Sequence, residues 1–86
     1  MKETGQKLPK WFEGELYSEG GMVRNRFSGE EYELNSMELS MYDFVMGCVM
    51  MAEMQMLDAP RHQTQLRKGL DWFRMNNAEA YMVLLD

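Results

Sequence analysis

The sequence predicts a small α+β domain, in which a three-stranded antiparallel β-meander packs on a long methionine-rich helix and a helical C-terminal segment. Residues 13–34 alternate short apolar runs with glycine-containing turns, residues 36–57 are dense in apolar side chains, and residues 60–85 repeat them at helical spacing. At 86 residues the chain has material for one domain, residues 1–86, with a single core. Because residues 1–9 are polar and end at a proline, we expect a flexible lead-in there.

The meander is predicted from three segments, GELYS, MVRNRF and EEYEL, which are separated by Glu19-Gly20-Gly21 and by Ser28-Gly29. In the last segment tyrosine and leucine alternate with glutamates, which is the period of a strand with one buried and one solvated face. A sheet of this size is not stable alone, so we expect its apolar face to rest on a helix.

The long helix is predicted to begin after Asn35 and to end near residue 57. Asn35 and Glu38 have the spacing of a capping box, in which each side chain bonds the backbone of the other residue. Ser40 with Asp43 offers an alternative start about one turn later. The helix should end before Pro60, since proline suits the first turn of a new helix better than the interior of an old one.

Two helical segments are predicted after the long helix. The first spans about residues 60–75, where leucines and a phenylalanine recur at spacings of four and three. The second spans about residues 78–85, and Asn76 with Glu79 repeats the capping-box spacing at its start.

The long helix is predicted to be apolar on two opposite sides, because residues 36–56 hold seven of the chain's 11 methionines. The core-facing side carries Met37, Met41, Phe44, Val45, Cys48, Met51 and Ala52. The opposite side, our candidate interaction surface, carries Leu39, Tyr42, Met46, Val49, Met50 and Leu57. Only a narrow polar strip of Ser40, Asp43 and Gly47 interrupts this pattern.

A helix that is apolar nearly all round is normally buried on both sides. Either the sheet and the second helix cover both sides within one chain, or the second side contacts another chain. That other chain is a second copy, giving a homodimer, or a different protein. Methionine is unbranched and polarizable and suits loose cores and adaptable binding grooves alike, so the residue type does not decide between the arrangements.

The formal net charge of -5 and the isoelectric point near 4.8 argue against nucleic acids and anionic membranes as partners, because both attract basic surfaces. The acidic residues concentrate in the predicted sheet. We interpret them as its solvated face, which also discourages edge pairing. The alternative is an acidic surface that docks on a basic protein or mimics the phosphates of DNA, carried by Glu13, Glu15, Glu30, Glu31 and Glu33.

We expect no catalytic, cofactor-binding or metal-binding residues, and hence no enzyme. Cys48 is the only cysteine and His62 the only histidine, whereas a structural zinc site needs about four ligands. The thiol lies in an apolar stretch with no cationic neighbour to lower its pKa, so a nucleophile and base pair is not expected. The start of the chain lacks the hydrophobic core of a secretory signal, and no apolar run is long enough to cross a bilayer. We expect a soluble, cytoplasmic protein.

Four stretches, LPKWFEGELYSEGG, VRNRFSGEEYELN, ELSMYDFVMG and KGLDWFRMNNAEAYMVLLD, carry a resemblance over most of residues 8–86. Together they resemble small uncharacterised proteins encoded by marine bacteriophages, especially those that infect cyanobacteria. This chain has Arg26 and Ala78 where the family pattern has proline, which softens local rigidity. The resemblance supplies no catalytic residues and implies a supporting role in the host cytoplasm during infection.

From these observations the sequence predicts a non-enzymatic protein-interaction module, in the form of a phage-encoded modulator of a host protein. Two alternatives are an acidic phosphate or DNA mimic that inhibits a basic or nucleic-acid-binding protein, and a small accessory structural protein.

Overall fold

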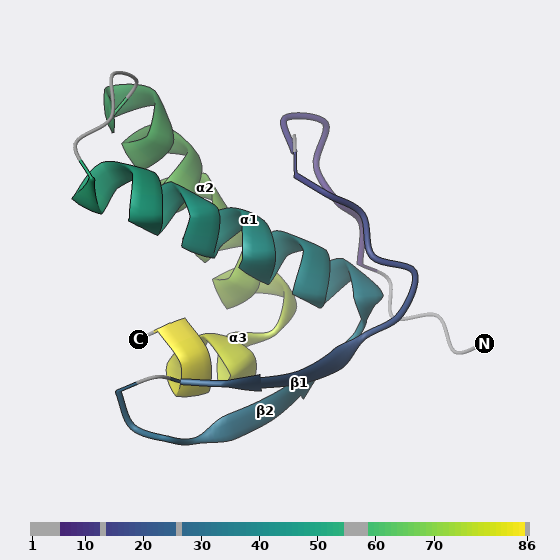
Figure 1. Cartoon of the computed structure of the whole chain (residues 1–86). Helices are drawn as coiled ribbons and strands as arrows, with labels where there is room; N and C mark the ends of the chain where they lie inside the picture. The colour runs from purple at the N-terminus through teal and green to yellow at the C-terminus, as the bar shows by residue number, and fades with distance from the viewer. Residues whose placement is uncertain (1–5, 13, 26, 55–58, 86) are drawn as a thin grey trace.

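The structure is a computed structural model that describes residues 6–12, 14–25, 27–54 and 59–85. Over these residues it is an α+β fold, which confirms the predicted class (Figure 1). The elements in chain order are the strands β1 (Gly21–Arg24) and β2 (Glu31–Leu34), the helices α1 (Ser36–Glu53), α2 (Ala59–Asn76) and α3 (Ala78–Ala80), and the π-helical turn η1 (Tyr81–Leu85).

The two strands form an antiparallel hairpin in which Gly21 pairs with Leu34 and Arg24 with Glu31. The connecting turn lies at Ser28-Gly29, as predicted. Gly29 has a φ of 81°, a left-handed conformation that glycine adopts without strain. The backbone N–H of Gly29 donates to the carbonyl oxygen of Asn25 at 2.8 Å and closes the turn.

The prediction of a three-stranded meander is wrong in one strand. In the described part of the chain only β1 and β2 pair, and the GELYS segment crosses α1 without joining the sheet. There the backbone N–H of Tyr17 donates to Ser40 Oγ at 2.9 Å. Gly20 does not turn a hairpin: a β-carbon on it would collide with the carbonyl oxygen of Leu34 and approach Asn35 Cα at 2.8 Å. The glycine therefore permits a close passage of two backbone segments.

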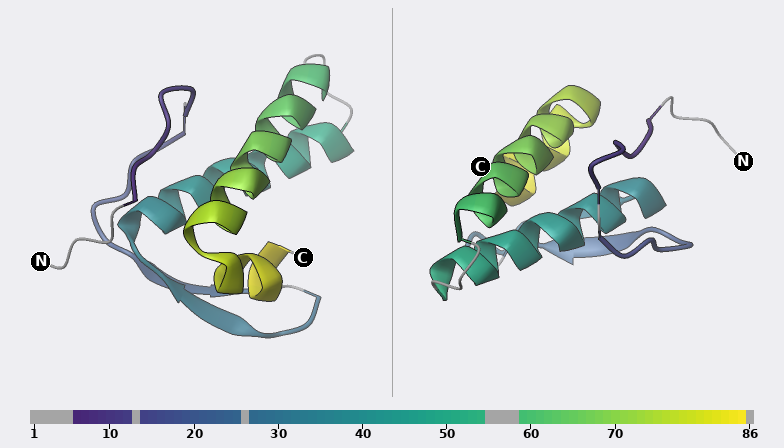
Figure 2. Two further views of the ribbon diagram at one scale, coloured as in Figure 1. Left: turned by 180° about the vertical axis from the view of Figure 1, so that it is seen from behind. Right: turned by 90° about the horizontal axis from the view of Figure 1, so that it is seen from above.

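The long helix packs chiefly on the second helix, and the sheet plays a smaller part than predicted. α1 and α2 pack against each other and cross at an angle (Figures 1 and 2). The C-terminal segment of α3 and η1 lies between this helix pair and the hairpin. The core cluster is shared by all of these elements and consists of Leu34, Met41, Val45, Trp72, Phe73, Ala80 and Leu84.

The first predicted capping box is confirmed, and the second does not form, because the cap lies one residue later and Ala80 has no side-chain acceptor to complete a box. Asn35 Oδ1 accepts from the backbone N–H of Glu38 at 2.8 Å, and Glu38 Oε1 accepts from that of Asn35 at 3.0 Å. At the second junction Asn77, not Asn76, caps α3, because its Oδ1 accepts from the backbone N–H of Ala80 at 3.1 Å. Asn76 instead donates through Nδ2 to the carbonyl oxygen of Trp72.

The predicted end of the long helix, near residue 57, falls outside the described residues. α1 is described as helical to Glu53, and the backbone N–H of Met54 still donates to the carbonyl oxygen of Met50 at 3.0 Å. The helical hydrogen-bond pattern therefore continues to Met54.

Candidate functional site

An open, largely apolar groove of about 350 Å³ lies where α1, α2, η1 and the hairpin meet. Val45 and Leu84 also belong to the core, so the groove opens directly onto it. The remaining lining residues are Tyr42, Met46, Val49 and Glu53 from α1, Leu66 and Leu70 from α2, Leu85 from η1, and Arg24, Asn25 and Phe27 from the hairpin.

The groove gathers half of the candidate interaction surface. Tyr42, Met46 and Val49 line it and are half-buried. Leu39 packs against the core cluster, and Met50 is 56% exposed but does not line the groove. Leu57 lies outside the described residues.

Two residues on the other sides of α1 differ from the prediction. Met51, expected in the core, is 39% exposed. Ser40, on the predicted polar strip, is buried, since the segment before β1 crosses over it. Cys48 is buried as predicted.

Asn25 fixes the hairpin side of the groove. Its Nδ2 donates to the carbonyl oxygen of Val83 at 2.9 Å, which ties the hairpin to η1. Its Oδ1 accepts from the backbone N–H groups of Phe27, at 2.8 Å, and Ser28, at 3.2 Å. Phe27 is held on this turn at the rim of the groove and is 87% exposed. Neither Asn25 nor Phe27 was predicted from the sequence, although asparagine favours turns because its side chain can bond the backbone two residues further on, as Asn25 does here.

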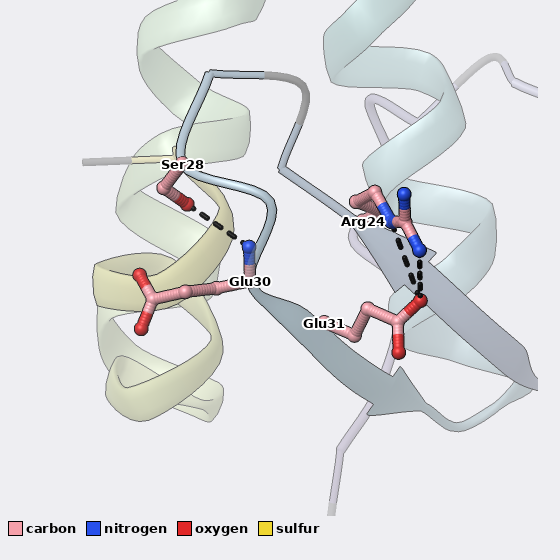
Figure 3. A network of polar contacts seen from close by, with 4 residues as sticks. All are labelled: Arg24, Ser28, Glu30 and Glu31. Carbon is pink, nitrogen blue, oxygen red and sulfur yellow. Dashed lines mark hydrogen bonds and ion pairs between the residues drawn. The ribbon is translucent and has the colours of Figure 1, made fainter.

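The candidate acidic surface is divided by the hairpin. Glu15, Glu30, Glu31 and Glu33 are exposed, and Glu13 lies outside the described residues. The side chains of Glu30 and Glu31 point to opposite sides of the chain (Figure 3). Glu31 Oε2 also accepts from Arg24 Nη2 at 3.0 Å and from its Nε at 3.3 Å. This cation partly neutralises the acidic face of β2.

Glu38 is the most buried carboxylate among the described residues, at 4% exposure. Besides the backbone N–H of Asn35, its carboxylate accepts from Gln6 Nε2 and from Asn77 Nδ2, each at 2.8 Å. Glu38 thereby connects the N-terminal segment, the start of α1 and the junction of α2 with α3. With its oxygens occupied by donors from three segments, the carboxylate has a structural role.

Burial raises the pKa of the Cys48 thiol, which keeps it protonated and weakly nucleophilic near neutral pH. The side chain of His62 lies outside the part that the structure describes. Within the described ranges, no three histidine, cysteine, aspartate or glutamate side chains come together as metal ligands could. Each helix in those ranges is too short or too polar to span a bilayer.

Comparison of the chain with protein-family models, with curated proteins and with solved structures gives no match.

Proposed function

We propose that this chain is a non-enzymatic protein-interaction module and that the groove between α1, α2, η1 and the hairpin is its contact surface. The supporting observation is that Tyr42, Met46 and Val49, on the second apolar side of α1, line an open groove in the folded chain.

The groove has the chemistry of a protein contact. Its lining is mainly aliphatic and aromatic, and its volume of about 350 Å³ has room for apolar side chains from a partner. Burial of such side chains removes apolar surface from water on both partners. Met46 adds an adaptable wall, since a methionine side chain rearranges easily around different shapes.

The partner proposed from the resemblance to marine phage proteins is a host protein in the host cytoplasm. A small module that binds through one groove can alter the activity or assembly of a larger protein without chemistry of its own. That role fits the three hydrogen bonds that hold the Glu38 carboxylate and the buried thiol of Cys48.

The proposal is tested by capture of partners from host cells with the wild-type chain, Met46→Glu and Met50→Glu. Met46 lines the groove, whereas Met50 is exposed on the same helix outside it, so the pair separates groove binding from a general loss of surface methionine. We expect Met46→Glu to weaken capture at least tenfold, which corresponds to about 1.4 kcal/mol, and Met50→Glu to retain it. Circular dichroism of each variant checks the fold.

Equal capture by the wild type and a folded Met46→Glu variant would refute the groove as the contact surface. Capture that survives Met46→Glu but disappears at high salt would point to the acidic alternative, because screening weakens contacts between exposed charges.

A further inference from the structure

We propose that the thioether sulfurs of Met50, Met51 and Met54, at the C-terminal end of α1, form a binding site for a soft monovalent cation of the Cu(I) class. None of the three residues lines the groove. The site is therefore independent of the proposed function.

The three methionines are accessible to an ion from water. Met50 is 56% exposed, Met51 39% and Met54 65%. They are three of the five residues from 50 to 54, so one short stretch of the chain presents three thioethers to solvent. An ion can reach these sulfurs without any opening of the core.

The helical spacing brings the three side chains together. The backbone N–H of Met54 donates to the carbonyl oxygen of Met50 at 3.0 Å, so helical geometry extends over the whole stretch. Around the helix axis Met54 lies about 40° from Met50 and about 60° from Met51, one turn further along. Side chains three and four positions apart on a helix have β-carbons about 5 to 6 Å apart. The three rotatable bonds of each methionine let the sulfurs converge on one ion.

The ligand chemistry selects Cu(I). Thioether sulfur is a soft, neutral ligand that favours Cu(I), whereas magnesium and calcium favour oxygen ligands. Zinc sites are built from cysteine, histidine and carboxylate side chains, and no three of these come together within the described ranges. The prediction that the chain has no metal-binding residues rested on zinc ligands, and thioethers are a separate class.

The electrostatic setting also favours a cation. The unpaired carbonyl groups at the C-terminal end of a helix carry partial negative charge, which basic side chains in the last turn often offset. Within its described span to Glu53, α1 has no basic residue in its last turn. The chain as a whole has a formal net charge of -5. A monovalent cation at the three methionines would offset the negative end of the helix.

The test is titration with Cu(I) under anaerobic conditions in the presence of ascorbate, in competition with a chromogenic Cu(I) chelator. We expect the wild type to bind one Cu(I). The triple variant Met50→Leu, Met51→Leu, Met54→Leu should bind it at least tenfold more weakly. Leucine keeps the apolar bulk and the helix propensity and removes only the sulfur. Circular dichroism of each variant checks the fold.

A second triple variant, Met22→Leu, Met75→Leu, Met82→Leu, is the matched control. It removes the same number of exposed thioethers, but from β1, α2 and η1, where they do not share one helix end. This variant should bind Cu(I) as tightly as the wild type.

Cys48→Ala separates the thioethers from the thiol, which is the other soft ligand on α1. Because Cys48 is only 3% exposed, this variant should keep the affinity of the wild type. Loss of binding in Cys48→Ala, with full binding in the first triple variant, would assign the ion to the thiol and overturn the proposal.

Methyl NMR of labelled methionines, with Ag(I) as a redox-inert probe, locates the ion directly. The signals of Met50, Met51 and Met54 should shift together up to one equivalent, and that of Met75 should stay in place. A wild type that binds no Cu(I), or a first triple variant that binds it as tightly as the wild type, would overturn the proposal. Either result leaves the groove and its host partner unaffected.

Discussion

Replacement of Glu38 by alanine should lower the free energy of unfolding by about 3 kcal/mol. The carboxylate accepts three hydrogen bonds, from the backbone of Asn35 and from the side chains of Gln6 and Asn77. Those three donors are only half-buried and can recover water, so we take about 1 kcal/mol for each bond, the central value for an ordinary hydrogen bond and less than is typical of a charged acceptor. For a chain of 86 residues the total stability is roughly 4 to 13 kcal/mol. The loss is therefore a large fraction of it.

Urea unfolding followed by tryptophan fluorescence measures this change, because Trp72 is buried in the core. Glu38→Gln should lose less, about 1 to 2 kcal/mol, since glutamine keeps one acceptor oxygen but places an amide donor against other donors. Glu33→Ala, at an exposed position on β2, is the control and should stay within about 0.5 kcal/mol of the wild type. If Glu38→Ala also stays within that margin, Glu38 does not connect the three segments in the way described.

Two glycines and the cysteine give further predictions. Gly20→Ala should destabilise the fold by about 1 to 3 kcal/mol, because the new β-carbon would collide with the backbone of β2. Gly47→Ala should stabilise it by about 0.5 to 1 kcal/mol, since a β-carbon there meets nothing within 4 Å in the middle of α1. Thermal melts compare the two variants, and a shift of the melting temperature in the same direction for both would contradict the packing described at the two glycines. Burial raises the pKa of Cys48 above its ordinary value of 9.0, so the folded chain holds the proton that the unfolded chain releases, and stability should fall as pH rises past that value. Unfolding curves at increasing pH should show this fall in the wild type and a shallower one in Cys48→Ala, and equal slopes would show that the thiol does not contribute.

The sequence predicted those parts of the fold that depend on local signals. The start of α1 follows from Asn35 and Glu38, which bond each other across one turn. The neighbouring asparagines at the second junction both suit a helix end, and tertiary contacts decide between them. Asn77 caps α3 while its side-chain amide reaches Glu38, and Asn76 turns back to Trp72. The local sequence pattern therefore does not show which of the two asparagines caps α3.

The third strand of the predicted meander is absent for the same reason, because a tertiary contact determines the path of that segment. The GELYS segment has a strand-like sequence, but its partner is the side chain of Ser40, which is 23 residues away from Tyr17 in the chain. The α1 wall of the groove was predictable because Tyr42, Met46 and Val49 follow helical periodicity. The hairpin wall was not, since Asn25 reaches the groove only through its hydrogen bond to Val83, 58 residues further along.

The most direct test of the groove is a methyl NMR spectrum of the chain with labelled methionines, recorded before and after addition of a captured host protein. We expect the Met46 methyl signal, which comes from the wall of the groove, to shift or broaden as the partner binds. The signals of Met75 and Met82, exposed away from the groove, should stay in place. An unchanged Met46 signal in the presence of the captured host protein would contradict a binding role for the second side of α1.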